Sequence, residues 1–160
     1  MNLEKLNICQ VTLSGNIEII KRNYINFKQF YKNLQFFIIC PNADLKKFKQ
    51  ELNLDNLQIY DEDEIIKFDR FKEIANPILK KTNYYEKIQD RLGWYYQQVL
   101  KLTFMYNFIK HNNQKLLIWD ADTVILKKIK FFDNEKSLTY GTTSEFFKAY
   151  YATNKTILGE

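Results

Sequence analysis

The sequence is poor in residues that break secondary structure. Its 160 residues include only four glycines and two prolines, and these are scattered along the chain. Linkers between domains are usually rich in glycine, serine or proline, and no such segment occurs here. The length is also typical of one domain. We therefore predict a single domain spanning residues 1–160.

Residues that commonly build metal centres or nucleophilic triads are also scarce. The two cysteines, Cys9 and Cys40, lie in apolar stretches and form no CxxC or Cys/His cluster of the zinc-binding type. His111 is the only histidine, in the polar segment 111–114, and no Gly-x-Ser-x-Gly turn accompanies it. We expect buried, reduced cysteines, which are ordinary in a reducing compartment.

Long apolar segments are missing as well. No stretch approaches the ~20 residues needed to cross a bilayer, and the N-terminus lacks the apolar core of a signal peptide. We therefore expect a cytoplasmic protein, either free or peripheral to the inner face of the membrane. The net charge of +5 suits an acidic ligand or an anionic surface. The lysines are too dispersed to indicate a nucleic acid as partner.

The apolar pattern predicts alternating strands and helices. Strands are expected at 7–13, 36–40, 57–60 and 115–120, and helices at 17–34, 43–52 and 92–110. We interpret 65–89 as irregular structure or short helices over the site, 124–129 as extended, and 137–141 as a further strand. Alternation of this kind is typical of a mostly parallel α/β sheet flanked by helices.

The most informative motif is Asp120-Ala121-Asp122, directly after the apolar run Leu116-Leu117-Ile118-Trp119. Mg²⁺ and Mn²⁺ prefer oxygen ligands, and one or two carboxylates plus substrate phosphates are a usual set for Mg²⁺. Residues i and i+2 of an extended segment point the same way, so Asp120 and Asp122 can converge if the backbone stays extended. The alternative is a surface turn with two solvated aspartates.

The helix expected at 92–110 precedes this motif and has two distinct faces. A spacing of ~100° per residue predicts that the sheet-facing side holds Leu92, Tyr96, Val99, Thr103 and Tyr106. A neighbouring arc holds Arg91, Trp94, Gln98 and Lys101, with Gln97 at its edge. Cations, amides and an indole can receive a phosphate, a ribose and a base. A polar helix face with Trp94 filling a gap is the competing interpretation.

Two further groups follow predicted strands. The acidic run Asp61 to Glu64, which includes Asp63, can contact a ribose or a base edge, or can cap a following helix. Thr12 and Ser14 close the first strand and can line a nucleotide site, or can serve only as turn residues.

The segments RLGWYYQQVLKL at 91–102 and LLIWDADTV at 116–124 resemble a largely uncharacterised bacterial family related to nucleotide-sugar glycosyltransferases of the GT-A fold. Phe131-Phe132 also fits that family's pattern. The resemblance is most specific over 91–132. It implies a Rossmann-like domain that binds a nucleoside diphosphate sugar, with Mn²⁺ or Mg²⁺ held by Asp122 directly and Asp120 at the ribose or the metal shell.

The resemblance also implies transfer of the sugar to a glycan or lipid-linked acceptor. Only 38 residues follow Asp122, fewer than GT-A domains usually have. We therefore expect either the N-terminal, donor-binding part of such a domain or a minimal or inactive relative. The resemblance identifies no catalytic base. Glu145 lies at a suitable distance along the chain, without a fixed position in space.

Two alternatives remain open. Asp120-Ala121-Asp122-Thr123-Val124 also fits the motif of haloacid-dehalogenase-type phosphatases, with Asp120 as nucleophile and Asp122 as acid/base. In those enzymes, however, the motif normally opens the domain. The other alternative is a non-catalytic nucleotide-sugar-binding module.

Overall fold

The protein is represented by a computed structural model that describes residues 5–80, 90–133 and 136–137. The chain divides into two compact units, Met1–Lys128 and Ile129–Glu160. Of the predicted strand at 137–141, only residue 137 belongs to the described residues. Glu145 lies outside them. Among the described helices, none is long and apolar enough to cross a membrane.

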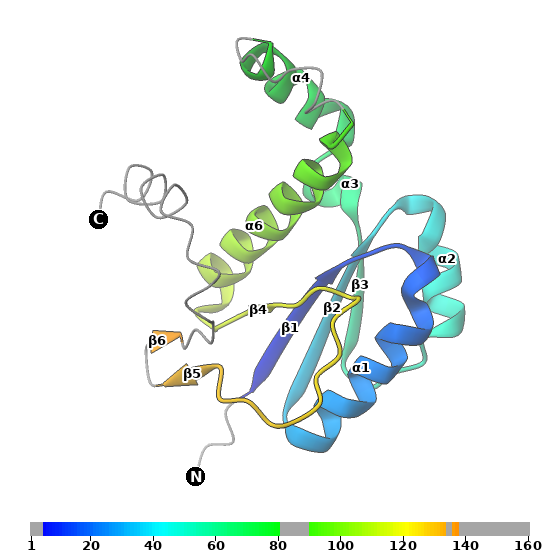
Figure 1. The fold of residues 1–160 in the computed structure, drawn as a ribbon, viewed down its shortest axis with the longest axis vertical. Coiled ribbons are helices and arrows are strands. Elements are labelled where there is room, and N and C mark those ends of the chain that lie inside the picture. The colour runs from blue at the N-terminus through cyan, green and yellow to red at the C-terminus, as the bar shows by residue number, and fades with distance from the viewer. Residues whose placement is uncertain (1–4, 81–89, 134–135, 138–160) are drawn as a thin grey trace. The chain divides into compact units, whose positions relative to one another are not determined.

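The first unit is built on a four-stranded, all-parallel sheet (Figure 1). Its strands are β1 (Leu6–Val11), β2 (Leu34–Cys40), β3 (Leu57–Asp61) and β4 (Leu117–Ile118), in the order β3-β2-β1-β4. The two central strands are almost continuously buried, as expected of parallel strands covered on both faces. The predicted α/β class with a parallel sheet is therefore confirmed.

Helices α1 (Ile17–Phe30) and α2 (Asn42–Glu51) cover one face of this sheet (Figure 1). The buried side of α1 includes Ile20, Tyr24 and Phe27. The rings of Tyr24 and Phe27 each pack edge-on against Phe36 of β2, and Phe48 of α2 is fully buried. Apolar residues three and four apart thus form one stripe along α1.

Helix α6 (Leu92–Asn112) packs on the opposite face of the sheet, and α3 (Glu62–Ile65) and α4 (Phe68–Leu79) pack against α6. One apolar cluster joins them to the sheet, and it includes Cys9, Val11, Phe37, Ile39, Phe71, Leu92, Tyr96, Leu100 and Phe104. Cys9 and Val11 alternate along β1 with Ile8 and Gln10, which therefore face the α1 side.

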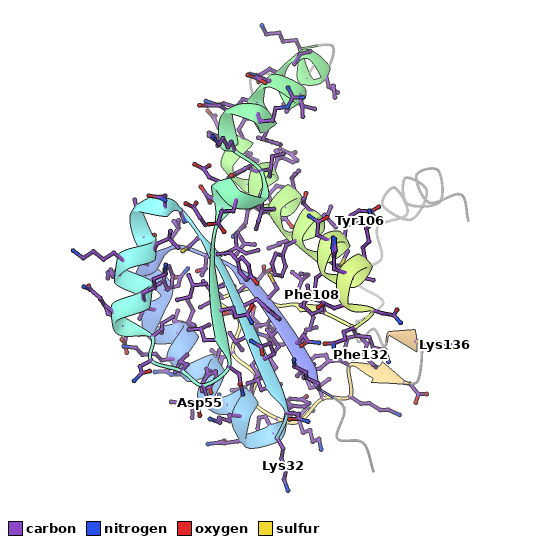
Figure 2. All side chains as sticks on the ribbon, turned by 180° about the vertical axis from the view of Figure 1, so that it is seen from behind. Lys32, Asp55, Tyr106, Phe108, Phe132 and Lys136 are labelled. Atoms are coloured by element: carbon purple, nitrogen blue, oxygen red, sulfur yellow. The ribbon has the colours of Figure 1, made fainter. Side chains whose placement is uncertain are left out.

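The face by which α6 meets the sheet matches the prediction at Leu92, Tyr96 and Val99 but differs toward the C-terminal end of the helix. The buried residues are Leu92, Tyr96, Leu100, Lys101 and Phe104, whereas Tyr106 is 64% exposed. Figure 2 shows Tyr106 turned away from the sheet and Phe108 turned toward it. Phe104 and Phe108 contact Phe37 at ring-centroid distances of 5.7 and 5.2 Å. Phe104 and Phe108 are four residues apart, so their rings lie on the same side of α6. Together they fill the space over Phe37 of β2.

Several element boundaries also differ from the prediction, most clearly those of α1 and β4. The helix expected at 17–34 ends at Phe30, because Tyr31 is extended and Leu34 pairs with Leu6 as the first residue of β2. The strand expected at 115–120 is only Leu117–Ile118. The segment expected to be extended at 124–129 is neither helix nor strand.

Within the second unit, β5 (Phe132–Asp133) and β6 (Lys136–Ser137) pair antiparallel. Lys130 and Asp133 form an exposed ion pair at 2.7 Å.

Candidate binding site at the ends of β1 and β4

The strand order changes direction between β1 and β4. The chain runs from β1 outward through β2 to β3, and then returns to place β4 on the other side of β1. α1 follows β1 on one face of the sheet, and α6 precedes β4 on the other. In open α/β sheets, ligands bind beyond the carboxyl ends of the strands at such a reversal. The carboxyl ends of β1 and β4 are therefore the expected ligand site.

The Asp120-Ala121-Asp122 motif lies at this position, but in a turn. The Thr123 amide donates to the Asp120 carbonyl at 3.1 Å, so the extended backbone assumed from the sequence is wrong. Ala121 is buried, whereas Asp120 and Asp122 are both exposed. The turn thus keeps both carboxylates on its solvent side. We call residues 120–123 the carboxylate turn.

Lys101 is the cation at this turn. Its ammonium bonds to Oδ1 of Asp120 at 2.5 Å, with side-chain exposures of 9% for Lys101 and 61% for Asp120. A buried ammonium is costly unless it is paired. Lys101, predicted to bind a phosphate, is therefore paired with Asp120, predicted to lie at the ribose or the metal shell. This pairing accounts for the carboxylate of Asp120 even without a ligand.

The remaining residues of the predicted helix arc are distributed along α6. Gln97 lies one turn before Lys101, and its amide donates to the Val11 carbonyl at 3.0 Å, at the end of β1. Gln98 is half-buried, and Trp94 is 56% exposed. Arg91 is exposed and lies ten residues before Lys101, which is about 15 Å along a helix axis. Arg91 and Lys101 therefore lie about three helical turns apart.

The connection between β1 and α1 is closed by its own hydrogen bonds. Thr12 is buried, and its hydroxyl accepts from Nδ2 of the Asn16 side chain at 3.0 Å. Ser14 donates its backbone N–H and its hydroxyl to the Asp44 carboxylate, each at 2.8 Å. The Asp44 carboxylate therefore already accepts from the two Ser14 donors that a phosphate at this loop would need. The turn-forming interpretation of Thr12 and Ser14 accounts for these contacts.

The acidic run after β3 caps a helix. Asp61 is buried at the N-cap of α3, where it accepts from the Asp63 amide at 3.0 Å and from the Asn42 side chain at 2.5 Å. The Asp63 side chain is exposed. Burial raises the pKa of the Glu62 carboxyl, and the neighbouring Asp63, Asp61 and Asp44 add to the increase. The helix-capping alternative is therefore confirmed for Asp61.

Sequence reasoning missed two contributors from α1. Asn23 and Asn26 donate to the carbonyls of Ala121 and Ile125, on either side of Asp122. The available signal was Asn23 itself, a polar residue within the apolar stripe of Ile20, Tyr24 and Phe27.

The carboxylates of Asp120 and Asp122 fit a divalent cation only when a bound ligand supplies further oxygen atoms to that cation. Asp120 and Asp122 supply carboxylate oxygens, the ligand type that Mg²⁺ and Mn²⁺ prefer. Over the described ranges, no group of three or more His, Cys, Asp or Glu side chains could hold a metal ion. Two carboxylates would suit a cation that takes its other ligands from phosphate and water.

These features define an α/β protein with a parallel sheet and a charged site where the strand order reverses. Residues 10–160 match the model of a family described as "Family of unknown function (DUF6492)". Because the match covers more than half of the chain, the chain belongs to this family. No curated protein and no solved structure matches it.

Proposed function

We propose that this chain binds a nucleoside diphosphate sugar in the manner of a GT-A glycosyltransferase, with Mn²⁺ or Mg²⁺ at the carboxylate turn. The sugar would pass to a glycan or lipid-linked acceptor. The observation that carries the proposal is the place of Asp120 and Asp122, directly after β4 at the reversal of strand order. The resemblance of 91–102 and 116–124 to such enzymes supports the same conclusion.

Asp122, Asp120 and Lys101 would each contact a different part of the bound cation and donor. Asp122, which is exposed on the turn, would hold the cation. Asp120 would complete the cation's shell or contact the ribose, while Lys101 beside it would pair with a phosphate oxygen. A bound divalent cation supplies Lewis-acid stabilisation of the departing diphosphate.

The N-terminal part of α6, before Lys101, would contact the rest of the nucleoside diphosphate sugar. Gln98 and Trp94 precede Lys101 by three and seven residues, which is about 5 and 10 Å along the helix. A ring of Trp94 that is 56% exposed can stack on a planar base. Arg91 would contact a part of the ligand other than the phosphate bound by Lys101.

Calorimetric titration of UDP and GDP, with and without Mn²⁺, tests the proposal. We expect Mn²⁺-dependent binding that is lost in Asp122→Asn. Asp69→Asn is the matched control, because it removes the same charge from an exposed carboxylate on α4. Equal affinity in Asp122→Asn and the control would reject the site.

Titrations with the corresponding nucleotide sugars, followed by product analysis, separate transfer from binding alone. Release of free nucleotide in the presence of a glycan acceptor would support a transferase. Tight donor binding without turnover would instead support the non-catalytic module.

A further inference from the structure

Two asparagines of α1 hold the loop that contains the carboxylate turn. Nδ2 of Asn23 donates to the Ala121 carbonyl at 3.2 Å, and Nδ2 of Asn26 donates to the Ile125 carbonyl at 2.9 Å. Ala121 immediately precedes Asp122, and Ile125 follows it by three residues. Both Ala121 and Ile125 are buried. The backbone is thus tied to α1 on each side of Asp122.

Trp119 provides a third connection to the same helix. Its ring packs edge-on against Phe27 of α1, with ring centroids 5.3 Å apart. Its indole N–H donates to the Thr123 carbonyl at 2.7 Å, across the turn. α1 therefore contacts the strand end before the turn, the turn itself and the loop after it.

Asn23 is difficult to explain by stability alone. It is fully buried in the apolar layer between α1 and the sheet, and its Oδ1 has no hydrogen-bond partner within the described part of the chain. Gln10 of β1 faces the same layer and is also fully buried, with neither polar side-chain atom partnered there. Unpaired buried polar atoms cost free energy, so an aliphatic residue would suit this layer better.

We infer that Asn23 and Asn26 are positioning residues for the carboxylate turn, an inference that rests on the proposed function of that turn. Asp122 is exposed, and the backbone of the turn sets the direction of its carboxylate. Partners that hold metal-binding groups in place typically change metal affinity by about 10–100-fold when they are removed. The buried polar atoms of α1 have the same role here.

The test compares Asn23→Leu and Asn26→Leu with Asn7→Leu. Asn7 is a matched control: it is buried in β1, its Oδ1 has no hydrogen-bond partner among the described residues, and its Nδ2 donates to the Lys115 carbonyl at 2.9 Å and to Oε1 of Gln114 at 3.3 Å, before β4. Asn7→Leu thus loses a comparable hydrogen bond to a backbone carbonyl, together with the longer bond to Gln114, without touching the turn. Asn26 is only half-buried, so Asn26→Leu remains informative if Asn23→Leu does not fold.

The first measurement is hydrogen exchange of the Trp119 indole N–H and the Thr123 amide by NMR. Both groups donate within the turn region, and neither is bonded to the asparagines. We expect exchange to accelerate about tenfold or more in the α1 variants relative to Asn7→Leu. Unchanged exchange would overturn the inference, whether or not any nucleotide binds.

The second measurement is the Mn²⁺-dependent affinity for UDP or GDP in the same variants. We expect an affinity about tenfold or more lower in Asn23→Leu, with Asn7→Leu within about twofold of the unmodified chain. If the unmodified chain binds and Asn23→Leu binds equally well, the positioning role fails while the proposed function stands. If the unmodified chain binds no nucleotide yet exchange accelerates, the proposed function fails while the α1 attachment stands.

Discussion

The Lys101–Asp120 pair predicts an asymmetric response to mutation. Only 9% of the Lys101 side chain is exposed, against 61% for Asp120. Asp120→Ala leaves a buried ammonium without its carboxylate, whereas Lys101→Met leaves an exposed carboxylate that water can solvate. The cost of losing the pair should therefore depend on which partner is removed.

The expected magnitudes follow from these exposures. Breaking a fully buried pair costs about 3–5 kcal/mol, and an exposed pair contributes about 0.2–1 kcal/mol. With one partner buried, we expect Asp120→Ala to lower the free energy of unfolding by about 1–3 kcal/mol. Lys101→Met should stay within about 1 kcal/mol, because methionine keeps most of the buried stem.

Urea unfolding followed by circular dichroism measures these differences. Asp122→Ala is the internal control, since it removes the other carboxylate of the turn and should change stability by less than about 0.5 kcal/mol. The double variant with Lys101→Met should be more stable than Asp120→Ala alone. Equal stability of Asp120→Ala and Asp122→Ala, or a loss in Lys101→Met as large as that in Asp120→Ala, would contradict this prediction.

Three further predictions concern other groups. Lys101→Ala should weaken UDP binding more than uridine binding in calorimetry, and an equal loss for both would make the helix arc purely structural. Burial raises the pKa of the Cys9 and Cys40 thiols from 9.0 to about 12. The free energy of unfolding should therefore fall as the pH rises from 9.0 to about 12, because the unfolded chain releases the thiol protons at lower pH than the folded chain does. Urea midpoints that do not change over this pH range would contradict this. Asn113, which follows α6 directly, has a φ of 48°. Asn113→Ala should therefore lower the free energy of unfolding by about 1 kcal/mol, whereas Asn113→Gly should not; equal urea midpoints would contradict this.

The element order could be predicted from the sequence because it depends on local patterns. The apolar runs of β1 and β2 and the stripe of α1 have periods that distinguish strand from helix. Strand–helix alternation then restricts the sheet to parallel pairing. The position of Asp120 and Asp122 after the fourth strand followed from the same pattern.

Side-chain partners could not be predicted in this way. α6 is apolar around much of its circumference, so the spacing allowed two sheet-facing sides, and contacts of Phe104 and Phe108 with Phe37 selected one. The turn at 120–123 depends on how β4 ends against β1, where the Trp119 amide donates to the Cys9 carbonyl at 3.0 Å.

The sequence by itself determined the α/β class, the approximate elements and the motif, because these depend on residues that are neighbours along the chain. The tertiary structure alone decided that β4 lies beside β1, that Lys101 meets Asp120, and that Asn23 reaches Ala121, 98 residues away. Such contacts join residues that no local period relates, and they form only when the helices pack on the sheet.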